Sequence, residues 1–402
     1  MAVWHINDYR VDIDTTRGGS GEINTNDWIA TVESGGYKVY QYNYSTKLGT
    51  AYSTTLQSSH PYNIQDLSPQ TPLEPLDVVL KVIPYSTTPG ATAETRLIHC
   101  ELATTLATGV GVNIAITAGG AVTFKVKLGG FTLGTVAATA GTEYVVHYRF
   151  DDAHGFHLME IFTLAGTLTG RVHYTSNALD NVIGVVDEIR LGADKFTNPA
   201  SGTIVHKLRH MYILDHSTEF GQDWFGWDYN VVADQSFVDS NVNWAPSAGA
   251  NQDAIDDWGP DGVYNSSDDG TTNDLEDEFS LTNYPGSKTV RAVSHYSLAR
   301  KNSAAQRHYS FIDDGSNHLR GPFIYGGTGS AIDSNEQHTY NLAPDGGIWT
   351  NADYDNLLVG YEKYNSDNSG RWMLMDVVIV FYVEANQYGA APRDRHISTS
   401  SD

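Results

Sequence analysis

The sequence of 402 residues predicts an all-β protein made of two consecutive antiparallel β-sandwiches of jelly-roll type, joined by a loop-rich linker. Three observations support this class. Apolar and polar residues alternate wherever a pattern exists, as in Val122, Phe124 and Val126 against Thr123 and Lys125. Turn residues recur at roughly 8–12 positions, the strand spacing of a sandwich. Tyr, Thr and Gly are frequent, and we find no convincing amphipathic helix.

The first sandwich is assigned to residues 76–216. Gly129 and Gly130 separate two alternating runs, and a pair of glycines in that position is a hairpin signal. Residues 1–75 form either an N-terminal arm or the first strands of this sandwich, and the sequence leaves both readings open. The other expected strands of the unit cover residues 77–84, 97–102, 110–117, 143–150, 156–164, 169–174, 185–191 and 203–214.

A change in composition marks the end of the first unit. Residues 217–237 are expected to be the linker, and residues 238–385 a second sandwich. Its final run, 372–383, is too apolar for an exposed strand, which predicts a central strand or an edge buried in an interface. Residues 386–402 lack periodicity and are expected to stay flexible until a neighbour orders them. The other expected strands cover 279–281, 290–299, 308–312, 323–325, 339–342 and 357–361.

The charge balance argues against two classes of partner. The chain has 24 Lys and Arg residues against 48 Asp and Glu, a net charge of −24 with His neutral. Nucleic acid and anionic membrane surfaces both need a basic face, so we expect neither partner. No run reaches the ~18 apolar residues of a membrane span. The N-terminus lacks the basic and apolar stretches of a secretion signal, which predicts synthesis in a cytoplasm.

Few residues carry a recognisable chemistry. The single cysteine, Cys100, excludes an intrachain disulfide and is expected to be a small buried apolar residue. A glycoside hydrolase on a sandwich needs two carboxylates facing one cleft, and Glu160 has no such partner nearby in the sequence. Asp187 and Glu188 are adjacent and point to opposite faces of a strand. The patterns of serine hydrolases, phosphate-binding loops and zinc proteases do not occur. We therefore predict no enzymatic activity.

The densest carboxylate cluster has two readings. Acidic and amide side chains around a glycine offer the oxygen ligands that calcium prefers, but the spacing does not fit the helix-flanked calcium loop. A solvated acidic loop is the favoured reading, calcium binding is the alternative, and no other cofactor is expected. The candidate ligands are Asp268, Asp269, Asn273, Asp274 and Glu276.

Tryptophan side chains suggest a further alternative, because an indole face can stack on a sugar. Most Trp residues in a β-protein are instead anchors of a core or an interface, which is the reading we favour for each one. The residues that qualify by type are Trp224, Trp227, Trp244, Trp258, Trp349 and Trp372.

The second unit carries a series of short motifs in a characteristic order. They are an acidic Tyr/Ser turn, an Asp-x-Phe strand, an alternating strand that ends in Ala-Arg-Lys and a Trp-Thr-x-x-Asp segment, at 261–267, 277–281, 290–301 and 349–353. This order resembles the virion structural proteins of tailed bacteriophages. Those proteins often carry an upstream concanavalin-like or laminin-G-like jelly roll, and three segments are similar to its penultimate strands, at 144–150, 156–163 and 187–191. The resemblance covers roughly residues 95–383 and supplies no catalytic set.

The resemblance implies a non-enzymatic structural or decorating protein on the exterior of a phage particle, on the capsid surface or the tail, made in the host cytoplasm. Its partners are expected to be other virion proteins and further copies of itself, since exterior components follow the particle symmetry. The alternatives are a carbohydrate-binding module of a tail fibre that grips host surface glycans and, third, a polysaccharide-degrading enzyme. The predicted interface residues are Met373, Met375, Val377, Ile379, Phe381 and Val383.

Overall fold

The computed structural model describes the secondary structure of most of the chain between residues 2 and 383. Within this part, no helix is long and apolar enough to cross a membrane. The described residues are 2–7, 29–30, 40–43, 48–53, 62–66, 76–86, 93–101, 109–117, 119–151, 154–176, 188–197, 204–215, 224–234, 237–247, 249–255, 265–266, 276–281, 288–301, 307–325, 338–364 and 371–383.

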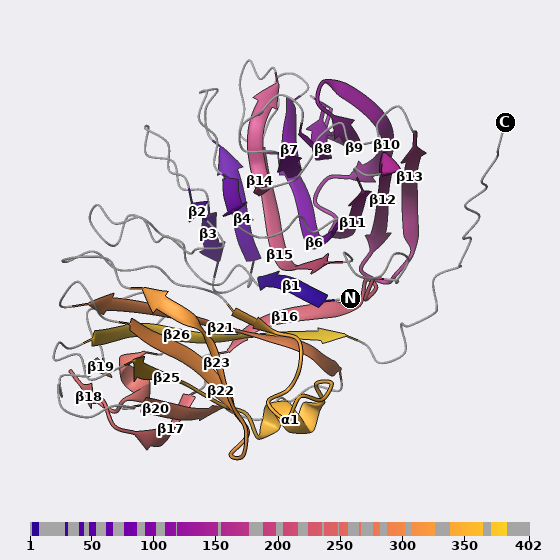
Figure 1. The fold of residues 1–402 in the computed structure, drawn as a ribbon. Coiled ribbons are helices and arrows are strands. Elements are labelled where there is room, and N and C mark those ends of the chain that lie inside the picture. The colour runs from indigo at the N-terminus through magenta and orange to yellow at the C-terminus, as the bar shows by residue number, and fades with distance from the viewer. Residues whose placement is uncertain are drawn as a thin grey trace.

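The predicted all-β class is confirmed, because four antiparallel sheets form two sandwiches (Figure 1). The first sandwich consists of sheets I and II. Sheet I has the order β10-β9-β8-β7-β14-β5-β2, with β2 at Ile29–Ala30, β5 at Tyr62–Asp66, β7 at Ala93–Glu101, β8 at Val110–Ile116, β9 at Ala121–Leu128, β10 at Phe131–Thr139 and β14 at Glu188–Thr197. Sheet II has the order β13-β12-β11-β6-β15-β4-β3, with β1 paired to β15; its strands are β1 Ala2–Asn7, β3 Tyr40–Asn43, β4 Leu48–Ser53, β6 Leu76–Ser86, β11 Tyr144–Asp151, β12 Phe156–Thr163, β13 Leu168–Thr175 and β15 Ile204–Asp215.

The second sandwich consists of sheets III and IV. Sheet III has the order β18-β19-β26-β21-β24, with β16 also paired to β26; its strands are β16 Tyr229–Asp234, β18 Ala245–Pro246, β19 Asn265–Ser266, β21 Thr289–Lys301, β24 His338–Tyr340 and β26 Arg371–Val383. Sheet IV has the order β17-β20-β25-β22-β23, with β17 at Phe237–Val242, β20 at Glu276–Leu281, β22 at Arg307–Asp313, β23 at His318–Tyr325 and β25 at Leu358–Tyr364.

The alternation of apolar residues determines which face of each strand is buried. In β9, Val122, Phe124 and Val126 enter the core between sheets I and II, and the intervening residues face outward. The hairpin that joins β9 to β10 turns at Gly129, whose φ of 52° suits a glycine. Strands from residues 1–75 lie in both sheets of this sandwich, and β1 pairs with its last strand.

The long apolar strand β26 lies inside sheet III. It pairs with β21 on one side and with β16 and β19 on the other. Val378, Val380 and Tyr382 face the core between sheets III and IV, whereas Phe381 and Val383 face the opposite way. Strand β16 falls in the range 217–237, which the sequence predicts to be a linker.

The described residues include one short α-helix, which has no amphipathic repeat. Helix α1, Asn351–Asp355, begins after Thr350. The Asp353 N–H donates to Thr350 Oγ1 at 3.2 Å, and the Thr350 N–H donates to Asp353 Oδ2 at 2.7 Å. This reciprocal capping box satisfies two backbone donors at the helix start, so a helix of five residues forms without an amphipathic repeat to reveal it.

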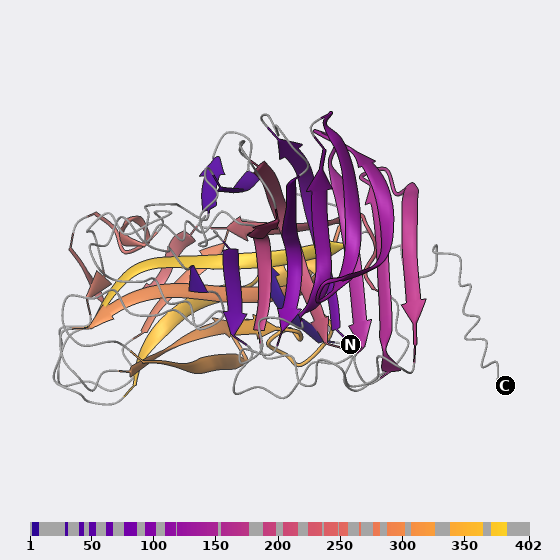
Figure 2. The ribbon, with the colours of Figure 1, turned by 90° about the horizontal axis from the view of Figure 1, so that it is seen from above.

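The two sandwiches meet through the outer faces of sheets II and III, whose strands run across one another (Figures 1 and 2). The four sheets therefore stack in the order I, II, III, IV. We call the buried apolar layer between sheets II and III the junction. Its residues are Val3, Ile6, Val79, Val145, Phe162, Tyr212, Leu214, Phe225, Tyr229, Val231, Ala292, Phe381 and Val383, with Trp224 and Trp227 packed against it.

Aromatic contacts connect the two sandwiches across the junction. The ring centroids of Tyr212 and Phe381 lie 4.8 Å apart, and those of Phe225 and Phe381 lie 5.2 Å apart. Strand β1 adds two hydrogen bonds between the sandwiches. The Val3 N–H donates to Asn341 Oδ1 at 2.6 Å, and Asn341 Nδ2 donates to the Val3 carbonyl at 3.0 Å. Aromatic pairs contribute both buried area and a preferred ring geometry, so the junction joins the sandwiches in one defined arrangement.

Replacing Phe381 should test how much the junction stabilises the protein. The Phe381→Ala change removes a fully buried ring that contacts both sandwiches, and such truncations cost about 3–5 kcal/mol. We expect a loss of this order in the free energy of unfolding measured by urea denaturation. Ile348→Ala is the control, because Ile348 is 72% exposed. Equal effects of the two changes would contradict a stabilising junction.

Candidate functional site

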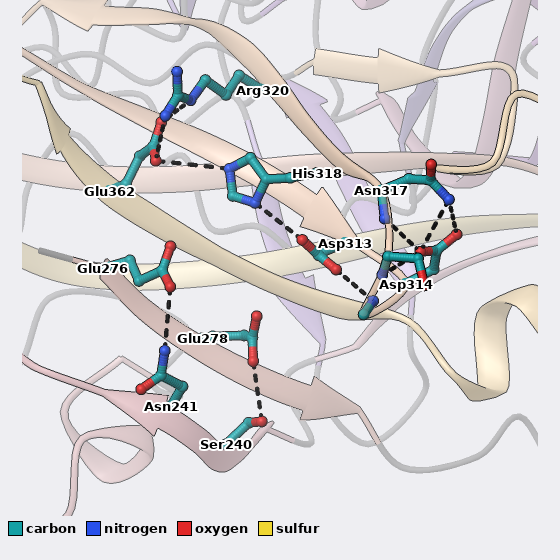
Figure 3. Close-up of polar contacts among 12 residues, drawn as sticks. Ser240, Asn241, Glu276, Glu278, Asp313, Asp314, Asn317, His318, Arg320 and Glu362 are labelled. Atoms are coloured by element: carbon teal, nitrogen blue, oxygen red, sulfur yellow. Dashed lines mark hydrogen bonds and ion pairs between the residues drawn. The ribbon is translucent and has the colours of Figure 1, made fainter. Parts of the chain in front are cut away.

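The outer face of sheet IV carries a cluster of charged and polar side chains (Figure 3). The alternation of β20 contributes to this cluster, since Glu276 and Glu278 point outward while Asp277 between them points into the sandwich. We call this surface the acidic face. It consists of Ser240, Asn241, Glu276, Glu278, Asp313, His318, Arg320 and Glu362.

One half of the acidic face is organised around Glu362 and His318. His318 Nδ1 lies 3.0 Å from Asp313 Oδ2, and its Nε2 lies 3.6 Å from Glu362 Oε2. Arg320 donates from Nη2 to Glu362 Oε2 at 3.0 Å, and its guanidinium lies over the Tyr309 ring at 5.4 Å from the centroid. The carboxylate of Glu362 is thus held by two cationic partners, although its side chain is only 4% exposed.

These contacts shift the pKa values of the partners in opposite directions. The hydrogen bond to Glu362 raises the pKa of His318 above 6.5, and Asp313 adds to this effect against the cost of partial burial. Burial alone would raise the pKa of Glu362, but His318 and Arg320 outweigh it and lower that pKa below 4.5. The contact between His318 and Glu362 therefore favours the charged form of both groups.

The other half of the acidic face carries less compensated negative charge. Glu276 accepts a hydrogen bond from Asn241 Nδ2, and Glu278 accepts one from Ser240 Oγ, each at 3.1 Å. Glu276 also lies directly opposite Glu362 in the strand register. Partial burial raises the pKa of Glu276, and Glu278, Glu362 and Asp313 raise it further while His318 opposes them. The like charges on this face therefore repel one another.

Asp277 on the inner side of β20 has a structural role. Its carboxylate is fully buried and accepts hydrogen bonds from the N–H groups of Asn243 and Trp244, both at 2.7 Å. Asn251 Nδ2 and the Tyr361 hydroxyl donate to its second oxygen at 2.9 and 3.0 Å. Burial raises the pKa of Asp277, and these four donors partly offset that effect. Asp277 thus fixes the chain after β17 onto sheet IV.

A second charged cluster lies on the outer face of sheet II, at the rim of the junction. Asp77 on β6, His147 on β11 and Glu160 on β12 are neighbours across three adjacent strands and are at most 6% exposed. His147 Nδ1 lies 3.1 Å from Glu160 Oε2, and its Nε2 lies 3.4 Å from Asp77 Oδ1. We call these three residues the buried triad.

Two arginines and a tryptophan complete the surroundings of the buried triad. Arg149 donates to both oxygens of Asp77 at 2.6 Å, and Arg171 Nε donates to Glu160 Oε1 at 2.7 Å. The Trp224 ring stacks on His147 with centroids 4.4 Å apart and an interplanar angle of 19°. Every carboxylate in the cluster is therefore paired, and the imidazole is covered, which is what allows charges to lie in an apolar layer.

Of the five calcium ligands predicted from the sequence, the structure describes Glu276. Glu276 lies on the acidic face, while Asp268, Asp269, Asn273 and Asp274 fall outside the described residues. Within the described part of the chain, no group of three or more His, Cys, Asp or Glu side chains is arranged to hold a metal ion. Calcium at the acidic loop stays a prediction.

The predicted interface residues of β26 divide into two groups. Phe381 and Val383 are buried in the junction against the first sandwich of the same chain. The side chains of Met373, Met375, Val377 and Ile379 are not among those that the structure describes. The tail 386–402 also lies outside the described residues. A contact between β26 and another chain stays a prediction for the undescribed positions.

The described tryptophans are all packed against apolar residues. Trp244 and Trp349 are buried in the core of the second sandwich, and Trp224 and Trp227 pack against the junction. Trp258 and the side chain of Trp372 lie outside the described part. Cys100 is fully buried, as expected for a small apolar residue.

Comparisons with known proteins reveal no family. No protein-family model matches the chain, and no curated protein matches it. Among solved structures, the CBM2 module of the evolved Dit protein of Lactobacillus casei BL23 phage J-1 has a TM-score of 0.36 and 12% identity, covering 53% of this chain and 94% of that chain. Alginate lyase A1-II′, of polysaccharide lyase family 7, has a TM-score of 0.33 and 13% identity, covering 47% and 94%. A protein of unknown function from Shewanella oneidensis MR-1 has a TM-score of 0.34 and 12% identity, covering 52% and 84%.

Removing the Glu362 carboxylate should lower the pKa of His318. Because that pKa is raised in the folded chain, His318 stabilises the protein below pH 6.5, and the contribution is lost as pH rises through the folded value. We expect Glu362→Gln to move the midpoint of the His318 imidazole resonance, followed by NMR titration, to lower pH. Glu278→Gln is the matched control on the same face, and an equal shift in both variants would show that contact with Glu362 is not the cause.

Proposed function

We propose that the chain is a non-enzymatic structural protein of the exterior of a phage particle, where it acts through protein–protein contacts. The junction carries this proposal. An apolar layer with aromatic contacts from both sandwiches joins sheets II and III, so the second sandwich is held as one block with the first. A block of four stacked sheets suits a building unit that must keep its shape under load from its neighbours.

The contacts of the buried triad support a non-enzymatic role. His147 and Glu160 are of residue types that serve in acid–base catalysis, and Glu160 is the carboxylate considered for glycoside hydrolysis. In the structure both are bound to oppositely charged partners, and Trp224 covers the imidazole. Groups committed to internal ion pairs in this way stabilise the fold, whereas a general acid or base must reach its substrate.

Sequence resemblance and charge support the proposed location. The order of motifs in the second sandwich resembles the virion structural proteins of tailed bacteriophages, and a net charge of −24 keeps such a protein from adhering to packaged DNA. We propose other virion proteins and further copies of this chain as its partners, in a homo-oligomer that follows the particle symmetry.

Analysis of purified particles tests this proposal. We expect mass spectrometry to find the chain in stoichiometric amounts, and cryo-electron microscopy to show a block of four stacked sheets on the outside. The supernatant that remains after the particles are sedimented from the same lysate is the control. Recovery of the chain from that supernatant alone would rule out a virion component.

A carbohydrate-binding module is the second candidate, and the acidic face favours it. The face presents carboxylate, amide, hydroxyl and guanidinium groups that hydrogen bonds hold in place, and a few fixed polar groups of this kind can orient a ligand rich in hydroxyls. Host surface glycans would be the ligand in that case.

A glycan array with the full chain separates the two candidates. For a purely structural protein we expect no glycan to be retained. Retention by the wild type that is lost in Glu276→Gln/Glu278→Gln would favour the carbohydrate-binding candidate. The control is Thr135→Lys/Ala137→Lys, which makes the same change in net charge on the exposed outer face of sheet I. Loss in both variants would mean that overall charge, and not the acidic face, controls retention.

A further inference from the structure

The buried triad occupies a position from which its charge can affect the contact between the two sandwiches. Asp77, His147 and Glu160 share the outer face of sheet II with the junction residues Val79, Val145 and Phe162. The Trp224 ring covers His147 at 4.4 Å and lies 5.3 Å from the Phe162 ring. The group that titrates is therefore in direct contact with the segment that enters the second sandwich.

We propose that His147 is a proton-controlled latch of the junction, which fastens residues 224–229 onto sheet II when the imidazole is protonated and loosens them when it is neutral. This inference does not depend on the proposed function, because it concerns the contact between two parts of one chain.

The surroundings of the triad favour the protonated ring. His147 Nδ1 lies within hydrogen-bond distance of Glu160 Oε2, and Nε2 lies 3.4 Å from Asp77 Oδ1, an ion-pair contact without a hydrogen bond. Only the imidazolium carries an N–H on both nitrogens. A neutral ring has one nitrogen that carries a lone pair in place of an N–H. That lone pair lies near a carboxylate oxygen, and the two repel each other inside a buried layer.

The other charged and titratable groups around the triad come from each neighbouring strand. Arg149 on β11 binds Asp77, and Arg171 on β13 binds Glu160. Tyr212 lies on β15. Burial raises the pKa of the Tyr212 hydroxyl, and Tyr229 and the negative charge of Asp77 raise it further. Lys81, further along β6, donates to the Tyr229 carbonyl. Because each arginine already neutralises one carboxylate, the proton on His147 decides whether the cluster is neutral or positive.

The directions of the pKa shifts indicate the pH range in which the latch acts. Burial alone lowers the pKa of His147, but Asp77 and Glu160 outweigh it and raise the pKa above 6.5. The stabilisation from the charged ring is therefore complete below pH 6.5 and is lost as pH rises through the folded pKa. Burial raises the pKa values of Asp77 and Glu160, but their cationic partners lower both overall. Their contribution is lost only in acid, as pH falls below 3.8 to 4.5 through the folded values.

Residues 224–229 can transmit the change because they contact both sandwiches. Trp227 stacks on Phe162 at 5.5 Å and covers Gly166, where an added Cβ would lie 2.2 Å from the indole. Phe225 contacts Tyr212 of sheet II and Phe381 of sheet III. A loss of support for Trp224 therefore reaches the aromatic contacts that hold the two sheets together.

Hydrogen exchange of the full-length protein across pH 5.5–9 tests the latch. After correction for the intrinsic pH dependence of exchange, we expect the amides of residues 224–229 to exchange severalfold faster once His147 is neutral, while the core strands of the first sandwich do not change. In His147→Gln this step should disappear. His154→Gln is the control, because the His154 side chain is 65% exposed, and it should keep the step.

A measurement on the wild type keeps the test decisive if His147→Gln does not fold. The His147 resonance should titrate with a midpoint above 6.5, and the indole N–H resonance of Trp224 should shift with the same midpoint. A midpoint below 6.5, an exchange step that persists in His147→Gln, or a step that is absent from the wild type would each overturn the proposal.

Discussion

The structure depends on the burial of apolar residues on both faces of sheets II and III. In a sandwich that stands alone, the outer face of each sheet is solvated and polar. Here β15 directs Met211 and Ile213 into the first core and Tyr212 and Leu214 into the junction. Removing both sets from water gives the contact between the sandwiches an apolar layer of its own, which favours one fixed arrangement over two loosely tethered domains.

Buried charge is tolerated at the rim of this layer because its partners come from adjacent strands. His147 on β11 lies opposite Glu160 on β12, and Asp77 on β6 lies opposite Arg149 on β11, so each carboxylate has an arginine partner. Part of the acidic face of sheet IV shows the opposite balance, because the hydrogen-bond donors to Glu276 and Glu278 among the described residues are an amide and a hydroxyl. One cluster therefore stabilises the interior, and the other leaves negative charge for solvent or a partner.

Most of the fold was predictable from local pattern, and much less of the sites was. The expected runs overlap every strand from β6 to β15 and from β20 to β26, but α1 and β16 were missed because neither has a period that stands out from its surroundings. Glu276 was singled out, yet for a loop and for calcium. Glu160 was considered without a partner, since His147 and Asp77 are 13 and 83 residues away in the sequence, and strand pairing alone brings them together.

The amino-acid pattern alone is sufficient for the all-β class, the hairpin at Gly129 and the buried nature of β26, because alternation and turn chemistry act over a few residues. It does not say what covers a second apolar face. For Phe381 and Val383, another chain and the first sandwich of the same chain were equally compatible with the pattern. Only the three-dimensional packing placed them against Tyr212 and Leu214, because the contact depends on how four sheets stack over a separation of more than a hundred residues.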